Sequence, residues 1–229
     1  MGNWTSGKAT IHSCPPHRVR AVTEILDQYG IPFDHSEDAE TDGEPQKTVV
    51  LGDWTSFEIG VGHATELAHS LINAAPEAAF TVYEEPGSEW LGKIYSYVRE
   101  LGLFTAPCDV DGDPLFTRTQ ALRLDEEPAE VRRRKLGLPW LTATAAMRPG
   151  VVVEPAFYAA HWDRRHAEVI IYGTPPAGET VTVAAPAEES EPAVDAALTM
   201  RGYTRATDWT DLDDHSQIRH TTVYPTTAC

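Results

Sequence analysis

Hydrophobic and polar positions alternate most regularly between residues 80 and 116, and this stretch predicts the central sheet of the chain. Phe80 and Val82 alternate with smaller or polar residues, as in a half-buried strand. A turn at residues 85–88, with Pro and Gly, separates them from a segment rich in aromatic and β-branched residues. Asp111-Gly112 is a hairpin signal, because both residues tolerate positive φ. We expect an antiparallel meander of three or four strands.

Apolar spacings of three and four residues before the meander predict two helices. They cover residues 17–29 and 64–75, and extended segments are expected at residues 10–14, 47–52 and 54–61. Helices on one face of a mostly antiparallel sheet make an α+β fold. We expect a ferredoxin-like N-terminal half, built on a split βαβ core.

The pattern changes after residue 116. Residues 117–149 predict a helical connector with short helices near residues 118–124, 129–136 and 140–147, and Arg148-Pro149-Gly150 is the expected boundary. Residues 150–229 then read as a second small α+β unit. The predicted domains are therefore 1–116, 117–149 and 150–229.

The meander also carries a family resemblance, in Val82-Tyr83-Glu84-Glu85-Pro86, Glu89-Trp90-Leu91-Gly92, Leu101-Gly102-Leu103-Phe104 and Cys108-Asp109-Val110-Asp111-Gly112. This pattern resembles a family of uncharacterised acidic proteins encoded by actinobacteria and their plasmids and phages. The resemblance covers roughly residues 8–145. It implies a mobile-element context and transfers no catalytic residue.

Charge is the most unusual feature of the composition. The chain has 35 acidic and 18 basic side chains, a net charge of −17. Such a charge argues against direct binding of nucleic acid and of anionic membranes, and it favours a basic protein partner or simple solubility. No apolar run approaches the ~20 residues of a membrane span. Three cysteines without framework spacing suggest a reducing, cytoplasmic setting, and we expect no cofactor.

Acidic residues recur in predicted turns, which are typically exposed. If folding aligns them, their carboxylates could imitate the phosphates of a duplex and capture the basic groove of a DNA-binding protein. The predicted partner-binding residues are Glu37, Asp38, Glu40, Asp42, Glu84, Glu85, Glu89, Asp211, Asp213 and Asp214. We therefore expect a non-enzymatic binding protein, a DNA mimic or inhibitor, with a structural or regulatory module of incidental acidity as an alternative.

Two patterns could bind metal. Asp109, Asp111 and Asp113 occupy the first three ligand positions of an EF-hand loop, but Pro114 replaces the required Gly and Gln120 the bidentate Glu. A plain hairpin turn is the favoured interpretation. His12, Cys14 and His17 suit zinc chemically, yet the sequence offers no second ligand pair at a typical spacing. We expect no metal site.

The remaining chemical candidate is the segment His161–His166. His161, Asp163 and His166 could perform general acid–base catalysis, so a small enzyme is the second alternative. The segment precedes an expected strand and is predicted as a polar loop. The one basic run, Arg132–Lys135, spreads around a helix and is expected to form local ion pairs.

Overall fold

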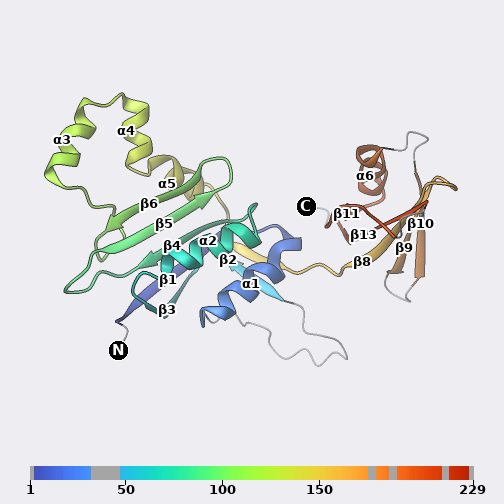
Figure 1. Cartoon of the computed structure of the whole chain (residues 1–229), viewed down its shortest axis with the longest axis horizontal. Helices are drawn as coiled ribbons and strands as arrows, with labels where there is room; N and C mark the ends of the chain where they lie inside the picture. The colour runs from blue at the N-terminus through green and yellow to red at the C-terminus, as the bar shows by residue number, and fades with distance from the viewer. Residues whose placement is uncertain (1–2, 32–46, 175–178, 186–189, 213–216, 227–229) are drawn as a thin grey trace. The chain divides into compact units, whose positions relative to one another are not determined.

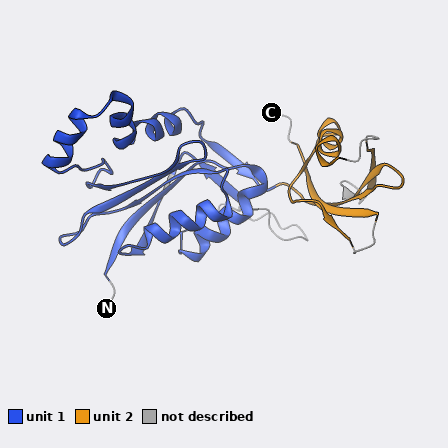
Figure 2. Cartoon of the chain, turned by 45° about the horizontal axis from the view of Figure 1, so that its top comes forward, with its two compact units in different colours: residues 1–154 blue, residues 155–229 orange. Residues whose placement is uncertain are grey.

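The structure, a computed structural model, describes residues 3–31, 47–174, 179–185, 190–212 and 217–226. The chain divides into two compact units, residues 1–154 and 155–229 (Figure 2). Both consist of helices and antiparallel sheets, so the predicted α+β class is confirmed. The helical segment predicted as a connector belongs to the first unit. No helix among the described residues is long and apolar enough to cross a membrane.

The first unit contains seven strands, five α-helices and a 3-10 turn within the described residues (Figure 1). They are β1 (Trp4–Ser13), η1 (Pro16–Arg18), α1 (Val19–Gln28), β2 (Thr48–Leu51), β3 (Trp54–Gly60), α2 (Ala64–Ala74), β4 (Ala79–Glu84), β5 (Gly92–Val98), β6 (Gly102–Cys108), α3 (Arg118–Glu126), α4 (Ala129–Lys135), α5 (Leu138–Ala145) and β7 (Gly150–Val153).

Five of these strands form one antiparallel sheet in the order β3-β1-β4-β5-β6. The predicted meander is its β4-β5-β6 half. Strands β3 and β4 are joined through α2 and flank β1, which makes one split βαβ unit. A ferredoxin-like sheet needs two such units. The second split unit is not formed. After α1 and β2 the chain enters β3, which lies directly beside β1 with no strand between them, and β2 pairs with β7 outside this sheet.

Helices α1 and α2 pack on one face of this sheet and form the main core. In β1 and β4 the inward positions alternate, with Ala9, Ile11, Phe80 and Val82 all buried. On α1 the buried positions recur every three or four residues, which explains its amphipathic helix. The chain leaves α1 through Gly30, whose φ of +67° suits glycine.

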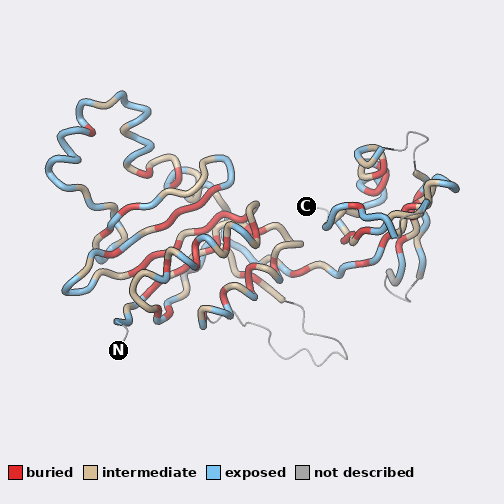
Figure 3. Tube along the Cα trace, in the orientation of Figure 1, coloured by how far each residue is buried: buried red, intermediate tan, exposed pale blue. Residues whose placement is uncertain are grey.

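The opposite face is covered in part by α5. Trp140 of α5 packs on Phe104 with ring centroids 5.3 Å apart, and its indole N–H donates to the Gly102 carbonyl at 2.8 Å. We call residues 117–148, which hold α3, α4 and α5, the arm. Figure 3 shows that α3 and α4 are mostly exposed, with Leu124 as the buried residue of α3. Helices therefore lie on both faces of the sheet, not on one as expected.

The boundary between the units lies later than predicted because of β7. Its four residues pair with β2, so that Val152 lies opposite Val49, and both join the core of the first unit. The expected second domain began at residue 150 and included this strand. Pairing across about a hundred residues has no local sequence signal.

The second unit is a twisted antiparallel sheet with one helix on it. Its elements are β8 (Tyr158–Asp163), β9 (Glu168–Thr174), β10 (Glu179–Ala184), α6 (Glu191–Met200), β11 (Tyr203–Arg205), β12 (Thr210–Asp211) and β13 (Ile218–Pro225). The strand order is β10-β9-β8-β13-β11, with β12 beside β13. Val194 and Leu198 of α6 pack with Trp162, Ile171 and Val223 in its core.

Strand β8 corrects the prediction of a polar loop at residues 161–166. Tyr158, Ala160 and Trp162 are buried, while His161 and Asp163 alternate with them on the other face of the sheet. The two-residue period was present in the sequence, but the charged residues that follow hid it. Only residues after Asp163 form the turn to β9.

Candidate protein-binding surface

Six carboxylate side chains gather at one end of the first unit's sheet, where β3, β4 and β6 end and β1 and β5 begin. We call this set the acidic end. It comprises Glu58, Glu85, Glu89, Asp109, Asp111 and Asp113. The strand ends lie side by side there, because Ser6 of β1 pairs with Glu58, and its carbonyl accepts the Glu85 N–H at 2.9 Å. The lysines of the adjoining strands are Lys8 and Lys93.

The turn between β4 and β5 presents Glu85 and Glu89. The indole N–H of Trp90 donates to the Glu85 carbonyl at 3.2 Å, and the Gly87 N–H donates to the Trp90 carbonyl at 3.1 Å. A Cβ atom on Gly87 would lie 2.3 Å from the Trp90 ring, so only glycine fits beneath the indole. The turn is thus held by its own residues, and neither glutamate side chain bonds to a described residue.

The second turn, residues 109–113, follows β6. One carboxylate oxygen of Asp109 accepts the N–H groups of Asp111 and Asp113 at 3.0 Å each, and Gly112 has a φ of +85°. This is a tight turn, as predicted, that closes through a bridge between Cys108 and Pro114. Asp109 is therefore engaged by backbone. Within the described parts of the chain, no group of three or more His, Cys, Asp or Glu side chains could hold a metal ion.

Tyr83 joins this turn to the sheet. Its hydroxyl donates a shared hydrogen bond to the carbonyls of Asp109, at 3.1 Å, and Val110, at 3.0 Å. Burial raises the pKa of Tyr83 to about 12, and the negative charges of Glu85, Asp109 and Asp111 add to the shift. The hydroxyl therefore stays protonated near neutrality and can donate to the turn.

Large apolar side chains are exposed at the same end. Trp4 is 68% exposed, Leu91 60% and Val110 64%, and each is a close neighbour in sequence or pairing of an acidic-end residue. A hollow of about 460 Å³ lies beside Trp4, lined by Asn3, Gly60, Val61 and His63. Sequence reasoning missed these residues. Leu91 and Val110 lie within two positions of an acidic residue, a signal that could have indicated them, whereas Trp4 has no acidic residue near it in the sequence.

Glu84 was predicted with the partner-binding residues, but its side chain is buried, with 1% exposure. Its two carboxylate oxygens accept the Gly62 N–H at 3.0 Å each, next to the start of α2. Successive strand residues face opposite sides, so Glu84 points into the core side while Tyr83 does not. Glu84 cannot contact a partner and stabilises the entry to α2 instead.

Of the other predicted acidic residues, Glu37, Asp38, Glu40, Asp42, Asp213 and Asp214 lie outside the described residues. Asp211 is described, and its carboxylate lies 2.8 Å from an Arg164 nitrogen and 3.4 Å from Arg219 Nε. Its charge is therefore compensated within the second unit.

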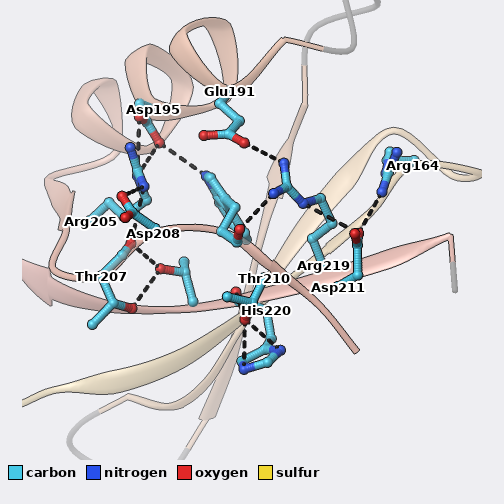
Figure 4. Close-up of polar contacts among 12 residues, drawn as sticks. Arg164, Glu191, Asp195, Arg205, Thr207, Asp208, Thr210, Asp211, Arg219 and His220 are labelled. Carbon is cyan, nitrogen blue, oxygen red and sulfur yellow. Dashed lines mark hydrogen bonds and ion pairs between the residues drawn. The ribbon is translucent and has the colours of Figure 1, made fainter. Parts of the chain in front are cut away.

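Asp211 belongs to a polar network that holds α6 to β12 and β13 (Figure 4). Arg219 also bonds Glu191 and the Trp209 carbonyl, and its side chain is only 19% exposed. Asp195 accepts hydrogen bonds from Arg205 Nε and from the Trp209 indole N–H, at 3.2 Å each. This network has a structural role, because each carboxylate faces an arginine of the same unit.

The structure brings Asp163 and His166 together but places His161 in a separate contact. Asp163 bonds the His166 ring at 2.7 Å and accepts the N–H groups of Arg165 and His166, which orders the turn after β8. The His166 hydrogen bond lowers the pKa of Asp163. The His161 ring instead packs edge-to-face on Tyr172, with the ring centroids 4.9 Å apart, and His161 pairs with His220 across β8 and β13.

His12 and Cys14, two of the N-terminal zinc candidates, each form a hydrogen bond with a different partner. His12 Nε2 lies 2.9 Å from the Thr81 hydroxyl, and the Cys14 thiol donates to the Pro15 carbonyl. Burial raises the pKa of Cys14 and of Cys108 to about 12, so both remain thiols near neutrality.

Comparison with known proteins provides no further guide. No protein-family model, no curated protein and no solved structure matches the chain.

Proposed function

We propose that the chain is a non-enzymatic binding protein that engages a basic protein through the acidic end. The observation that carries this proposal is the combination of uncompensated carboxylates with exposed apolar side chains on one rim. Glu85, Glu89 and Asp111 have no ion-pair partner among the described residues, and Trp4, Leu91 and Val110 lie exposed around them. Protein interfaces combine exposed apolar side chains, which become buried on binding, with charged side chains that steer the partner.

Electrostatics supports a basic partner. A net charge of −17 attracts cationic surfaces over long range, and clustered carboxylates speed the encounter in a salt-dependent way. Tyr83 and Trp90 already hold the turns that carry these carboxylates in place. Binding should therefore cost little conformational entropy. A partner that itself binds DNA through a basic groove fits this chemistry, and the chain would then act as a DNA-mimicking inhibitor.

The test is a pull-down with the immobilised full chain from a lysate of the source organism, eluted in salt steps and identified by mass spectrometry. The site variant combines Glu85→Gln, Glu89→Gln and Asp111→Asn. The control variant makes the same chemical changes elsewhere, with Glu24→Gln, Glu100→Gln and Asp53→Asn, all at exposed positions without a described partner. Both variants have the same net charge.

We expect a basic protein that the wild type and control variant retain at low salt and the site variant releases at a lower step. Equal retention by both variants would remove the acidic end from the interface and overturn the proposal. Competition by duplex DNA then decides the finer point. If DNA displaces the partner, the chain occupies a nucleic-acid groove; if it does not, the mimic is wrong and the binding role stands.

A further inference from the structure

The arm differs in charge from the rest of the chain. Residues 117–148 carry seven Lys and Arg side chains and four Asp and Glu side chains, a net charge of +3 in a chain of −17. Part of this charge serves the arm itself. Arg134 donates to the Leu101 carbonyl at 2.9 Å and lies over the Trp140 ring, while Arg132 lies 3.7 Å from Asp125. Arg118, Arg123 and Arg133 have no described partner.

A hollow of about 320 Å³ lies inside the arm, where α3 and α4 approach each other. Its lining combines two kinds of side chain. Leu124, which is 8% exposed, and the half-buried Phe116 are apolar, and Gln120, Arg123 and Lys135 are hydrogen-bond donors. Among the residues that the structure describes, no carboxylate lines it. A cavity of this size suits a small organic molecule.

The donors differ in how far they are already occupied. Lys135 Nζ lies 2.5 Å from a Glu127 carboxylate oxygen, so its charge is largely compensated. Gln120 accepts the Thr117 N–H with its amide oxygen as part of the α3 capping box, which leaves its amide N–H groups without a described acceptor. The Arg123 guanidinium has neither an ion pair nor a hydrogen bond with any residue that the structure describes. It can bind a carboxylate, sulfonate or phosphate oxygen pair with two parallel bonds.

From this arrangement we infer that the hollow binds a small amphipathic anion. The apolar or aromatic body of the ligand lies on Leu124 and Phe116, and its acid group receives hydrogen bonds from Arg123 and Gln120. A neutral apolar ligand would leave the Arg123 donors unused. A polyanion such as nucleic acid would meet one uncompensated arginine at the hollow and repulsion from the acidic chain. This inference uses no residue of the acidic end and does not rest on the function proposed for it.

The experiment is a fluorescence titration of the full chain with 8-anilinonaphthalene-1-sulfonate, an aromatic sulfonate of the required class. We expect binding with one-to-one stoichiometry. Arg123→Gln replaces charge-assisted hydrogen bonds by weaker neutral ones. It should weaken the affinity about tenfold, which corresponds to about 1.4 kcal/mol of binding free energy. Arg123 is exposed and has no partner within the described ranges, so this variant is expected to fold normally.

Arg133→Gln is the matched control, because it makes the same charge change on the arm outside the hollow. It should leave the affinity for the sulfonate unchanged. The uncharged dye N-phenyl-1-naphthylamine should bind wild type and Arg123→Gln equally, which separates the anion contact from apolar binding. The inference is overturned if Arg123→Gln binds the sulfonate like the wild type, or if Arg133→Gln weakens it as strongly.

Discussion

In the second unit, the carboxylates of Glu191, Asp195 and Asp211 all contact arginine side chains, whereas those of Glu85, Glu89 and Asp111 at the acidic end contact no described side chain. From the sequence alone, Glu85 and Glu89 of the acidic end and Asp211 of the second unit belong to the same predicted partner-binding set. The difference lies in what folding places opposite each carboxylate. Acidic charge holds one region together and leaves the other free to meet a partner, so the two regions should respond oppositely to substitution.

The largest effect is expected from Arg219→Met. This change leaves Glu191 and Asp211 without their shared arginine and the Trp209 carbonyl without its donor. Arg219 is only 19% exposed, but water reaches the carboxylates of Glu191 and Asp211, which are 40% and 56% exposed. The loss of these ion pairs and of the hydrogen bond to Trp209 should therefore lower the free energy of unfolding by about 2 kcal/mol. Urea denaturation followed by tryptophan fluorescence measures it, since Trp162 and Trp209 lie in the core of this unit.

Arg201→Met is the control for that change, because Arg201 is exposed and has no described partner. It should shift the unfolding free energy by less than about 0.5 kcal/mol. If both variants lose the same stability, the network has no structural role.

A smaller loss is expected from Tyr83→Phe at the acidic end. Two contacts from the hydroxyl to backbone carbonyls disappear, which should cost about 1 kcal/mol. Hydrogen exchange should become faster at the Asp111 and Asp113 amides, which the turn protects. Tyr29→Phe serves as the control, since the Tyr29 hydroxyl has no described partner; unchanged exchange in Tyr83→Phe would contradict this anchoring role.

A pH-dependent effect separates the two regions further. The hydrogen bond from His166 lowers the folded-state pKa of Asp163 below its ordinary value of 3.8, so the unfolded chain binds this proton first. The resulting stability is complete above that ordinary value and is lost as the pH falls through the folded pKa. Asp163→Asn keeps an oxygen for the turn's N–H groups and removes the charge.

We therefore expect the free energy of unfolding of the wild type to exceed that of Asp163→Asn by up to about 1 kcal/mol near pH 6. This difference should disappear below the folded-state pKa of Asp163. Thermal unfolding of both proteins from pH 6 to pH 2 measures it. A gap that stays constant over this range would show that the charge of Asp163 does not matter.

The smallest effect is expected when Glu85, Glu89 and Asp111 are neutralised together. No described bond is lost and mutual repulsion decreases, so the unfolding free energy should change by less than about 0.5 kcal/mol or rise slightly. Urea denaturation of the triple variant measures it. A large loss would mean that these carboxylates are structural, like those of the second unit.

Local pattern predicted much of the first unit. The meander and α2 followed from alternation and from spacings of three and four, and the Asp111-Gly112 turn from its chemistry. The strand pairings could not be predicted in the same way. The β2–β7 ribbon joins segments about a hundred residues apart, and β1 lies between β3 and β4, which follow it in the chain.

The candidate site was predicted by residue type rather than by position. Glu85 and Glu89 were predicted and lie at the acidic end, but Glu84, next to them, points inward because strand side chains alternate. The compensation of Asp211 depends on Arg164 and Arg219, which are far from each other in sequence. The exposure of Trp4 depends on which strand ends leave it uncovered. Each of these facts needs the tertiary arrangement.

The β2–β7 ribbon also determines when the first unit can finish folding during synthesis. A ribosome adds ~5–20 residues per second, so β2 waits several seconds for its partner strand to be made. Until then Val49, fully buried in the finished unit, lacks the cover of Val152, and the β2 backbone has an open edge. The nascent chain is thus exposed to mispairing and to chaperones until about two thirds of it has left the ribosome.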